Sequence, residues 1–269
     1  MGIRQTAAKG ARAVLNGAGI EMTILRNATR RFGGVEFTWG EADAGYVRGG
    51  VREFVQDGKP VRFFIASETD EIQRVQRQGS FYEPEELAII SAHYTGGVFL
   101  DVGANVGNHA IYAALFLGAP RVIAIEPNPP AARILNYNLM LNGLTDRITH
   151  IPVGFGRESA RAEARTIDHN LGATEMVVSA DGAIQIVPGD EVITEDVSFI
   201  KIDTEGFELD VIAGLSRTIE RCRPVMFIEV GPGNEPGFLS AMDQIGYRIT
   251  EKFERYAEFA NYLVEPQPG

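Results

Sequence analysis

The sequence predicts an α/β fold built on a mostly parallel sheet, and two observations lead to that prediction. Short apolar runs with strand composition alternate along the chain with helix patterns. In addition, residues 98–127 read as strand, glycine turn, helix, strand and acid, in that order. This order of elements is half of a nucleotide-binding α/β sheet.

The length, cysteine count and net charge of the chain exclude several classes of protein. The 269 residues fit one large domain, or a catalytic domain with an added N-terminal piece. Cys222 is the only cysteine, which rules out an internal disulfide and favours a reducing compartment, so we expect a cytoplasmic location. The net charge of −11 argues against nucleic acid as a partner, because phosphate backbones need a basic face. No apolar run approaches the roughly 20 residues of a membrane span, so no integral membrane segment is expected.

Residues 1–33 differ from the rest of the chain in charge. They hold several basic residues and a single acid, Glu21. Such a basic segment, rich in alanine and glycine, is expected to be solvated and flexible, with at most a weak helix over residues 5–15. The alternative is contact with an acidic lipid or glycan surface. The basic residues are Arg4, Lys9, Arg12, Arg26, Arg30 and Arg31.

Residues 34–95 are expected to form a small β-rich cap followed by the helix that leads into the main sheet. Strand composition at residues 35–39 and 61–65 predicts the cap. The helix is predicted within residues 80–93, where Pro84 suits the first turn. The two aromatic residues before it, Phe81 and Tyr82, either hang over a cofactor pocket or form a hydrophobic staple.

The glycine turn after the first strand is the predicted ligand site. Gly103 and Gly107 let the backbone turn tightly and leave room for a ligand, and the helix that starts at about Asn108 offers free N–H groups. Glu126 ends the next strand, where a carboxylate can accept both hydroxyls of a ribose. Asp101 precedes the turn and suits a ligand with a positive group, such as the amino end of S-adenosylmethionine. The turn lacks the third glycine of the G-x-G-x-x-G fingerprint, so a pyrophosphate is less well served. The alternative is a turn that merely packs.

The middle of the chain continues the alternation. A helix is predicted over residues 128–142, with Asn128 as N-cap, and a third strand over residues 148–153 that closes at Gly154. Residues 157–197 are not a simple crossover. A hairpin is expected around Asp181-Gly182, within an inserted lobe beside the site.

The last third of the chain carries a second charged centre. Residues 197–202 read as the fourth strand, and Lys201 inside it is costly unless a carboxylate such as Asp203 or Glu229 pairs with it. Carboxyl ends of parallel strands face the ligand, so Asp203 is the first candidate for a general base and Glu205 the second. The alternative is that Asp203 only pairs with Lys201 or holds a cofactor's amino group. A helix over residues 207–219, a strand over 224–230, a helix over 238–246, and a terminal strand pair at 247–250 and 261–264 complete the prediction.

Histidines and metal ligands add little to this site. His109 follows the glycine turn and is expected to line the pocket, and His169 is a second-rank alternative base. No His, Cys and Asp spacing typical of zinc is present, so no metal site is predicted. The alternative is a weakly bound divalent ion at Asp203 and Glu205.

Four segments together resemble the FkbM family of S-adenosylmethionine-dependent methyltransferases. They read FYEPEEL, FLDVGANVGNHAIYAA, VIAIEPNP and FIKIDTEGFELDVIAGL, and they lie within residues 81–215. The resemblance implies a class I methyltransferase-like, Rossmann-like sheet of seven strands with an antiparallel last strand. It also implies O-methylation of a sugar, glycan, polyketide or other small-molecule hydroxyl. Residues 96–269 would form the S-adenosylmethionine-binding methyltransferase domain.

The resemblance also assigns roles to residues. The candidate catalytic residues are Asp203, Glu205 and Lys201, and Glu208 belongs to the same motif. Two other function classes remain: an NAD-type dinucleotide-binding oxidoreductase, and a cofactor-binding scaffold without catalysis. The candidate cofactor-binding residues are Asp101, Gly103, Ala104, Asn105, Gly107, Asn108, His109, Glu126, Pro127, Asn128, Gly154 and Asp203.

Overall fold

The computed structural model describes residues 11–16, 19–24, 29–32, 35–38, 48–167, 170–231, 233–256 and 259–268. Side chains are described from residue 48 onward, apart from those of residues 166–170, 172–173 and 256. The predicted base candidate His169 lies outside the described residues. Among the described helices, none has both the length and the apolar character needed to cross a membrane.

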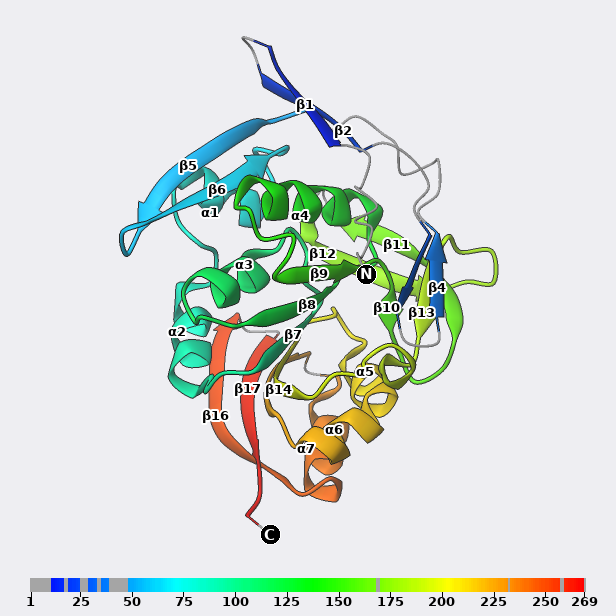
Figure 1. The fold of residues 1–269 in the computed structure, drawn as a ribbon. Coiled ribbons are helices and arrows are strands. Elements are labelled where there is room, and N and C mark those ends of the chain that lie inside the picture. Colours follow the sequence, from blue (N-terminus) through cyan, green and yellow to red (C-terminus); the bar gives the residue numbers. More distant parts are fainter. Residues whose placement is uncertain are drawn as a thin grey trace, which may run out of the picture.

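A seven-stranded sheet forms the centre of the molecule, in the order β16-β17-β15-β14-β7-β8-β9 (Figure 1). The pairs from β15 through β14, β7 and β8 to β9 are parallel, whereas β17 pairs antiparallel with both β15 and β16. The predicted seven strands and antiparallel last strand are therefore confirmed, and the predicted parallel pairing holds for the part of the sheet from β15 to β9. The strands are β7 (Val98–Val102), β8 (Arg121–Ile125), β9 (Ile148–Ile151), β14 (Val197–Ile202), β15 (Val225–Val230), β16 (Tyr247–Tyr256) and β17 (Phe259–Pro266).

Helices cover both faces of this sheet. Alternate strand residues point to opposite faces, so Phe99 and Phe199 pack with α2, α3 and α4, whereas Leu100 and Ile200 pack with α5, α6 and α7. The long helix predicted from residue 207 to 219 is instead two helices that meet at Leu215. Its glycine, Gly214, approaches the backbone of residue 156 too closely for a Cβ, which would lie 2.0 Å from that carbonyl oxygen. The helices are α2 (Pro84–His93), α3 (Asn108–Leu115), α4 (Pro129–Leu141), α5 (Glu208–Gly214), α6 (Ser216–Cys222) and α7 (Glu235–Gln244).

The described residues of the N-terminal part form three antiparallel hairpins and one helix that the sequence did not predict, α1 (Glu71–Gln78). The weak helix expected over residues 5–15 is wrong for residues 11–15, which belong to strand β1, and residues 5–10 lie outside the described residues. The third hairpin packs on α4, where Asn138 and Asn142 accept hydrogen bonds from the backbone N–H groups of Phe64 and Arg62. The hairpin strands are β1 (Ala11–Asn16), β2 (Gly19–Ile24), β3 (Thr29–Phe32), β4 (Val35–Thr38), β5 (Gly50–Gln56) and β6 (Lys59–Ile65).

Residues 157–197 belong mainly to a second, four-stranded sheet, in the order β10-β13-β11-β12. The hairpin predicted around Asp181-Gly182 is wrong, because β12 pairs only with β11, and β13 pairs with β11 and β10. Glycine is instead needed at position 182 because the chain passes close beside β11 there. A Cβ on Gly182 would lie 2.3 Å from the carbonyl oxygen of Ala162. The elements are β10 (Gly154–Phe155), β11 (Ala160–Ile167), β12 (Asn170–Val178), β13 (Ile184–Val187) and a 3₁₀ turn, η2 (Gly189–Glu191).

Candidate active site

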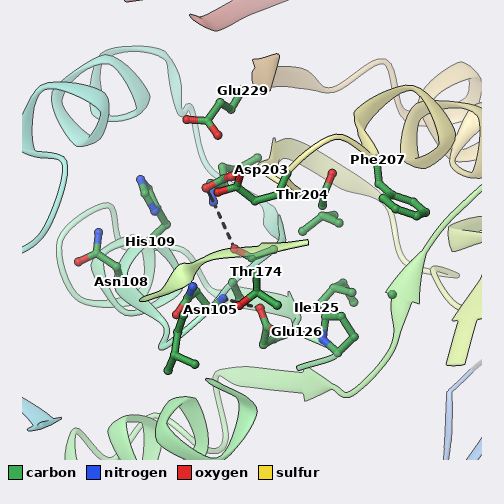
Figure 2. A pocket seen from close by; sticks show the side chains of 18 of the residues that line it. Asn105, Asn108, His109, Ile125, Glu126, Thr174, Asp203, Thr204, Phe207 and Glu229 are labelled. Atoms are coloured by element: carbon green, nitrogen blue, oxygen red, sulfur yellow. Dashed lines mark hydrogen bonds and ion pairs between the residues drawn. The ribbon is translucent and has the colours of Figure 1, made fainter. Parts of the chain in front are cut away.

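A cavity of about 600 Å³ lies at the carboxyl ends of the central strands. Strand order reverses between β7 and β14, and this is the place where open α/β sheets bind ligands. The cavity wall is completed by β12 and β13 of the second sheet and by the segment before α2 (Figure 2). Most of the site residues that the sequence predicted line this cavity. They are Gly103, Ala104, Asn105, Asn108, His109, Glu126, Pro127, Gly154, Lys201, Asp203 and Glu205.

Three of the predicted site residues stay out of the cavity lining. Asp101 is fully buried beneath the glycine turn. Gly107 starts α3 with a φ of 92°, and a Cβ there would lie 2.5 Å from the Cδ1 atom of Leu135. Asn128 occupies the N-cap position of α4, but its amide hydrogen-bonds to the hydroxyl of Thr174 rather than capping the helix.

The glycine turn is shaped by one close approach. Gly103 has a φ of 84°, and a Cβ on it would lie 1.7 Å from the carbonyl oxygen of Asp203. Only glycine therefore lets the turn after β7 pass the turn after β14. Asn105 follows with a φ of 49°, a conformation that asparagine tolerates better than most residues.

Glu126 is held in place by the backbone at the end of β8. Its Oε2 atom accepts a hydrogen bond of 2.8 Å from the backbone N–H of Asn105, and its Oε1 atom accepts one of 2.7 Å from the N–H of Asn128. Burial raises the pKa of Glu126 to about 7, although both hydrogen bonds act in the other direction. Each carboxylate oxygen keeps a further lone pair for hydroxyl groups in the cavity.

Lys201 is the buried cation of the site. It lies directly across from Asp101 in the pairing of β14 with β7. Its Nζ atom is 2.9 Å from Oδ2 of Asp203 and 3.7 Å from Oδ1 of Asp101. Burial alone would lower the pKa of Lys201, but the two aspartates hold it above its ordinary value. The pairing that the sequence required for this lysine is therefore present.

Acids outnumber this cation at the end of the cavity near β14 and β15. Carboxylate oxygens of Asp203, Glu205 and Glu229 all lie within 4.8 Å of one another. Burial, and then the charge of Asp203, raise the pKa of Glu205 to about 8 and that of Glu229 to about 11. Asp203 behaves differently: burial would raise its pKa, but Lys201 holds it below the ordinary value. Asp203 is thus a weaker proton acceptor than its neighbours.

Glu83 is a site residue that sequence reasoning did not single out. It precedes α2 with a left-handed backbone, φ 58° and ψ 56°, and its side chain lines the cavity. Burial, followed by the charge of Asp203, raises its pKa to about 8. Of its aromatic neighbours, Tyr82 lines the cavity, whereas Phe81 is buried among other aromatic rings.

Backbone strain marks the same cavity. Three of the residues other than glycine with a positive φ line it: Glu83, Asn105 and Glu205. Such strain concentrates at functional sites, because the surrounding structure must hold it in place. No pattern in the sequence distinguished Glu83, since Glu83, Glu85 and Glu86 together are usually interpreted as favourable charges at the start of a helix.

Comparison with known proteins agrees with the resemblance to the FkbM family that the sequence shows. A family model described as the methyltransferase FkbM domain matches residues 101–264. The chain is 28% identical over 188 residues to the hexuronic acid methyltransferase AglP of Haloferax volcanii, over 66% of this chain and 74% of that protein. It is 31% identical over 116 residues to a ribosomal protein L11 methyltransferase of a Geobacter species, over 41% of this chain but only 37% of that protein.

One solved structure has a related description. A crystal structure of methyltransferase FkbM from Methylobacillus flagellatus aligns with a TM-score of 0.49 at 20% identity. The alignment covers 71% of this chain and 52% of that chain. The present chain therefore spans about half of that protein.

Proposed function

The chain belongs to the FkbM family of methyltransferases, and from that premise we propose that it transfers the methyl group of S-adenosylmethionine to a hydroxyl of a sugar or other small-molecule acceptor. The observation that carries this proposal is the cavity itself. A backbone-held carboxylate, Glu126, faces one end of it, and a group of acids around a single lysine, Lys201, faces the other.

The residues at the Glu126 end fit an adenosine group. Glu126 has free lone pairs for the two ribose hydroxyls. Gly154, Pro127 and Ile186 lie side by side in the lining, and they offer an apolar slot for an adenine ring. The Oδ1 atom of Asn105 is buried without a hydrogen-bond partner among the described residues, so it is available to a ligand.

The acidic end fits the charged part of the same molecule. S-adenosylmethionine supplies an electrophilic methyl group on a positively charged sulfur and carries an ammonium group. The ionised carboxylate of Asp203 would favour that positive charge, Glu205 and Glu229 offer further carboxyl oxygens beside it, and Lys201 fixes the orientation of Asp203. The rest of the catalysis would be alignment of donor and acceptor. Asp203 and Glu205 are the candidate bases that the sequence predicted.

The proposed class of methyl acceptor rests on one relative and on the charges at the β14 end of the cavity. AglP is described as a hexuronic acid methyltransferase, which favours a sugar acceptor for this chain. A carboxylate acceptor would meet the negative charge of Asp203 at the β14 end, where Lys201 is already paired with that aspartate. A neutral hydroxyl avoids that repulsion, so we propose O-methylation. An NAD-type oxidoreductase does not agree with the methyltransferase family to which the chain belongs.

The test is a calorimetric titration with S-adenosylhomocysteine. We expect micromolar binding to the wild-type protein and at least about tenfold weaker binding to Glu126→Ala, a loss of roughly 1.4 kcal/mol. NADH should not bind. Unchanged affinity in Glu126→Ala, or preferred binding of NADH, would refute the proposed cofactor site.

A further inference from the structure

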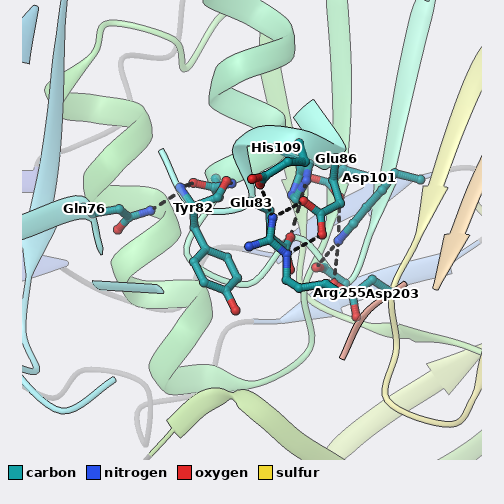
Figure 3. A network of polar contacts seen from close by, with 12 residues as sticks. Gln76, Tyr82, Glu83, Glu86, Asp101, His109, Asp203 and Arg255 are labelled. Atoms are coloured by element: carbon teal, nitrogen blue, oxygen red, sulfur yellow. Dashed lines mark hydrogen bonds and ion pairs between the residues drawn. The ribbon is translucent and has the colours of Figure 1, made fainter. Parts of the chain in front are cut away.

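Glu83 is held rigidly although no regular element contains it. The Oδ1 atom of Asn108 accepts a hydrogen bond of 2.9 Å from the backbone N–H of Tyr82, and its Nδ2 atom donates one of 2.8 Å to the carbonyl oxygen of Tyr82 (Figure 3). On the other side, Glu86 forms hydrogen bonds with the guanidinium of Arg255, which comes from β16. The left-handed backbone of Glu83 is therefore fixed by contacts on both sides.

The side chain of His109 lies next to that of Glu83 in the cavity wall. The Nε2 atom of His109 is 3.7 Å from Oε2 of Glu83, which is too long for a hydrogen bond. That nitrogen has no hydrogen-bond partner among the described residues, although the side chain is only 6% exposed. Burial lowers the pKa of His109 to about 3, so the ring is neutral. A buried, unpartnered ring nitrogen in a cavity wall points to a ligand group.

No oxygen atom fits directly between two atoms that are 3.7 Å apart, but an oxygen beside the pair can contact both of them. A hydroxyl oxygen placed about 2.8 Å from each atom would accept a hydrogen bond from Nε2–H of His109 and donate its proton to Oε2 of Glu83. A hydroxyl can make both bonds at once, whereas a carboxylate has no proton to donate.

We propose that Glu83 takes the proton of the acceptor hydroxyl during methyl transfer, and that His109 positions the acceptor oxygen. This inference rests on the proposed function. The acceptor oxygen bonds to the methyl carbon while the carbon–sulfur bond breaks and its electron pair stays on sulfur. The hydroxyl proton moves to Oε2 of Glu83.

The charges around the two candidate bases favour Glu83 over Asp203. Asp203 lies 2.9 Å from the ammonium of Lys201, which lowers its affinity for a proton. Among the described residues, Glu83 forms no ion pair within 4.0 Å with a lysine or arginine. Its raised pKa, about 8, is closer to the value that suits a general base at neutral pH.

The variant Glu83→Gln tests the proposal, with Glu85→Gln as the matched control. Glu85 is exposed, lies two residues after Glu83 in the first turn of α2, and pairs with Arg255 at 2.6 Å. We expect Glu83→Gln to bind S-adenosylhomocysteine and methylthioadenosine within about twofold of wild type. Single-turnover methyl transfer to a panel of neutral hexosides should fall by about 100-fold or more, as for the loss of a general base. Glu85→Gln should match wild type in every measurement.

The pH profile separates a base from a structural residue. Because Glu83 must be ionised to accept a proton, transfer by wild type should rise with pH through about 8. The rise should be lost in Glu83→Gln but kept in Asp203→Asn. Infrared difference spectra offer a readout without an acceptor: at pH 7, wild type should show one more protonated carboxyl band than Glu83→Gln.

Several outcomes would overturn this assignment. If Glu83→Gln binds S-adenosylhomocysteine more weakly but methylthioadenosine normally, Glu83 holds the cofactor's ammonium group instead. If the variant transfers methyl groups as fast as wild type, Glu83 is not the base. Failure of the wild-type protein to bind S-adenosylhomocysteine would refute the proposed function itself. Normal binding of S-adenosylhomocysteine without methyl transfer to any hexoside would overturn the sugar hydroxyl as the group that contacts both Glu83 and His109.

Discussion

The two ends of the cavity treat buried carboxylates in opposite ways. At the end of β8, Glu126 receives two backbone N–H groups and is fixed in one orientation. At the ends of β14 and β15, Asp203 pairs with Lys201, and burial, together with the charge of Asp203, raises the pKa values of Glu205 and Glu229. The first arrangement suits a group that only binds. The second places an ionised aspartate beside glutamates that hold protons at neutral pH, which suits a cationic ligand and proton transfer.

The largest expected effect comes from breaking the turn that separates the two ends. Gly103→Ala places a Cβ 1.7 Å from the carbonyl oxygen of Asp203, so one of the two turns must move. We expect a loss of roughly 4 kcal/mol or more in the free energy of unfolding, together with lost cofactor binding. Urea denaturation measures the first.

Gly118→Ala is the matched control for this substitution. Gly118 also has a positive φ, 69°, but nothing lies within 4 Å of a Cβ there. Only backbone strain of about 1–2 kcal/mol should remain. Equal losses in the two variants would mean that the approach of the turn to Asp203 does not constrain the site.

Removing the cation at the acidic end should have the next largest effect. Lys201→Met leaves Asp101 and Asp203 buried without their partner, and we expect a loss of about 3–5 kcal/mol in unfolding free energy. Arg121→Met breaks a half-exposed pair with Glu195 and should cost about 1 kcal/mol or less. Similar losses in the two variants would show that Lys201 does not neutralise the acids.

The acidic end should also make stability depend on pH. In the unfolded chain its glutamates ionise near pH 4.5, whereas the pKa values of Glu83 and Glu205 in the folded protein are about 8. Between these values the folded protein holds protons that the unfolded chain has lost, so stability falls as pH rises. We expect a lower free energy of unfolding at pH 8.5 than at pH 7, and a smaller difference in the double variant Glu205→Gln, Glu229→Gln. Stability that rises over this range would contradict the charge assignment.

The smallest expected effect concerns metal ions. Lys201 already neutralises Asp203, so a divalent ion between Asp203, Glu205 and Glu229 would lie beside an ammonium group. We therefore expect EDTA to change methyl transfer by less than about twofold. Loss of transfer in EDTA and its recovery with Mg²⁺ would instead identify the three acids as metal ligands.

The same contrast explains what the sequence could predict. The Glu126 end depends on a glycine turn, a strand and an acid that are close in sequence, so its residues were identified. The pairing of Lys201 with Asp203 followed from the cost of burying a charge in a central strand. Glu83 could not be found in this way, because its role depends on His109 and Arg255, which reach it only through the fold. The pairing of β13 was missed for the same reason, since the contact of Gly182 with Ala162 leaves no local pattern.

The most direct test of this account is a crystal structure of the protein with S-adenosylhomocysteine. The account predicts both ribose hydroxyls within hydrogen-bond distance of Glu126, and the sulfur facing the space between Asp203 and Glu83. A nucleoside bound outside this cavity, or a sulfur that faces away from both acids, would contradict it.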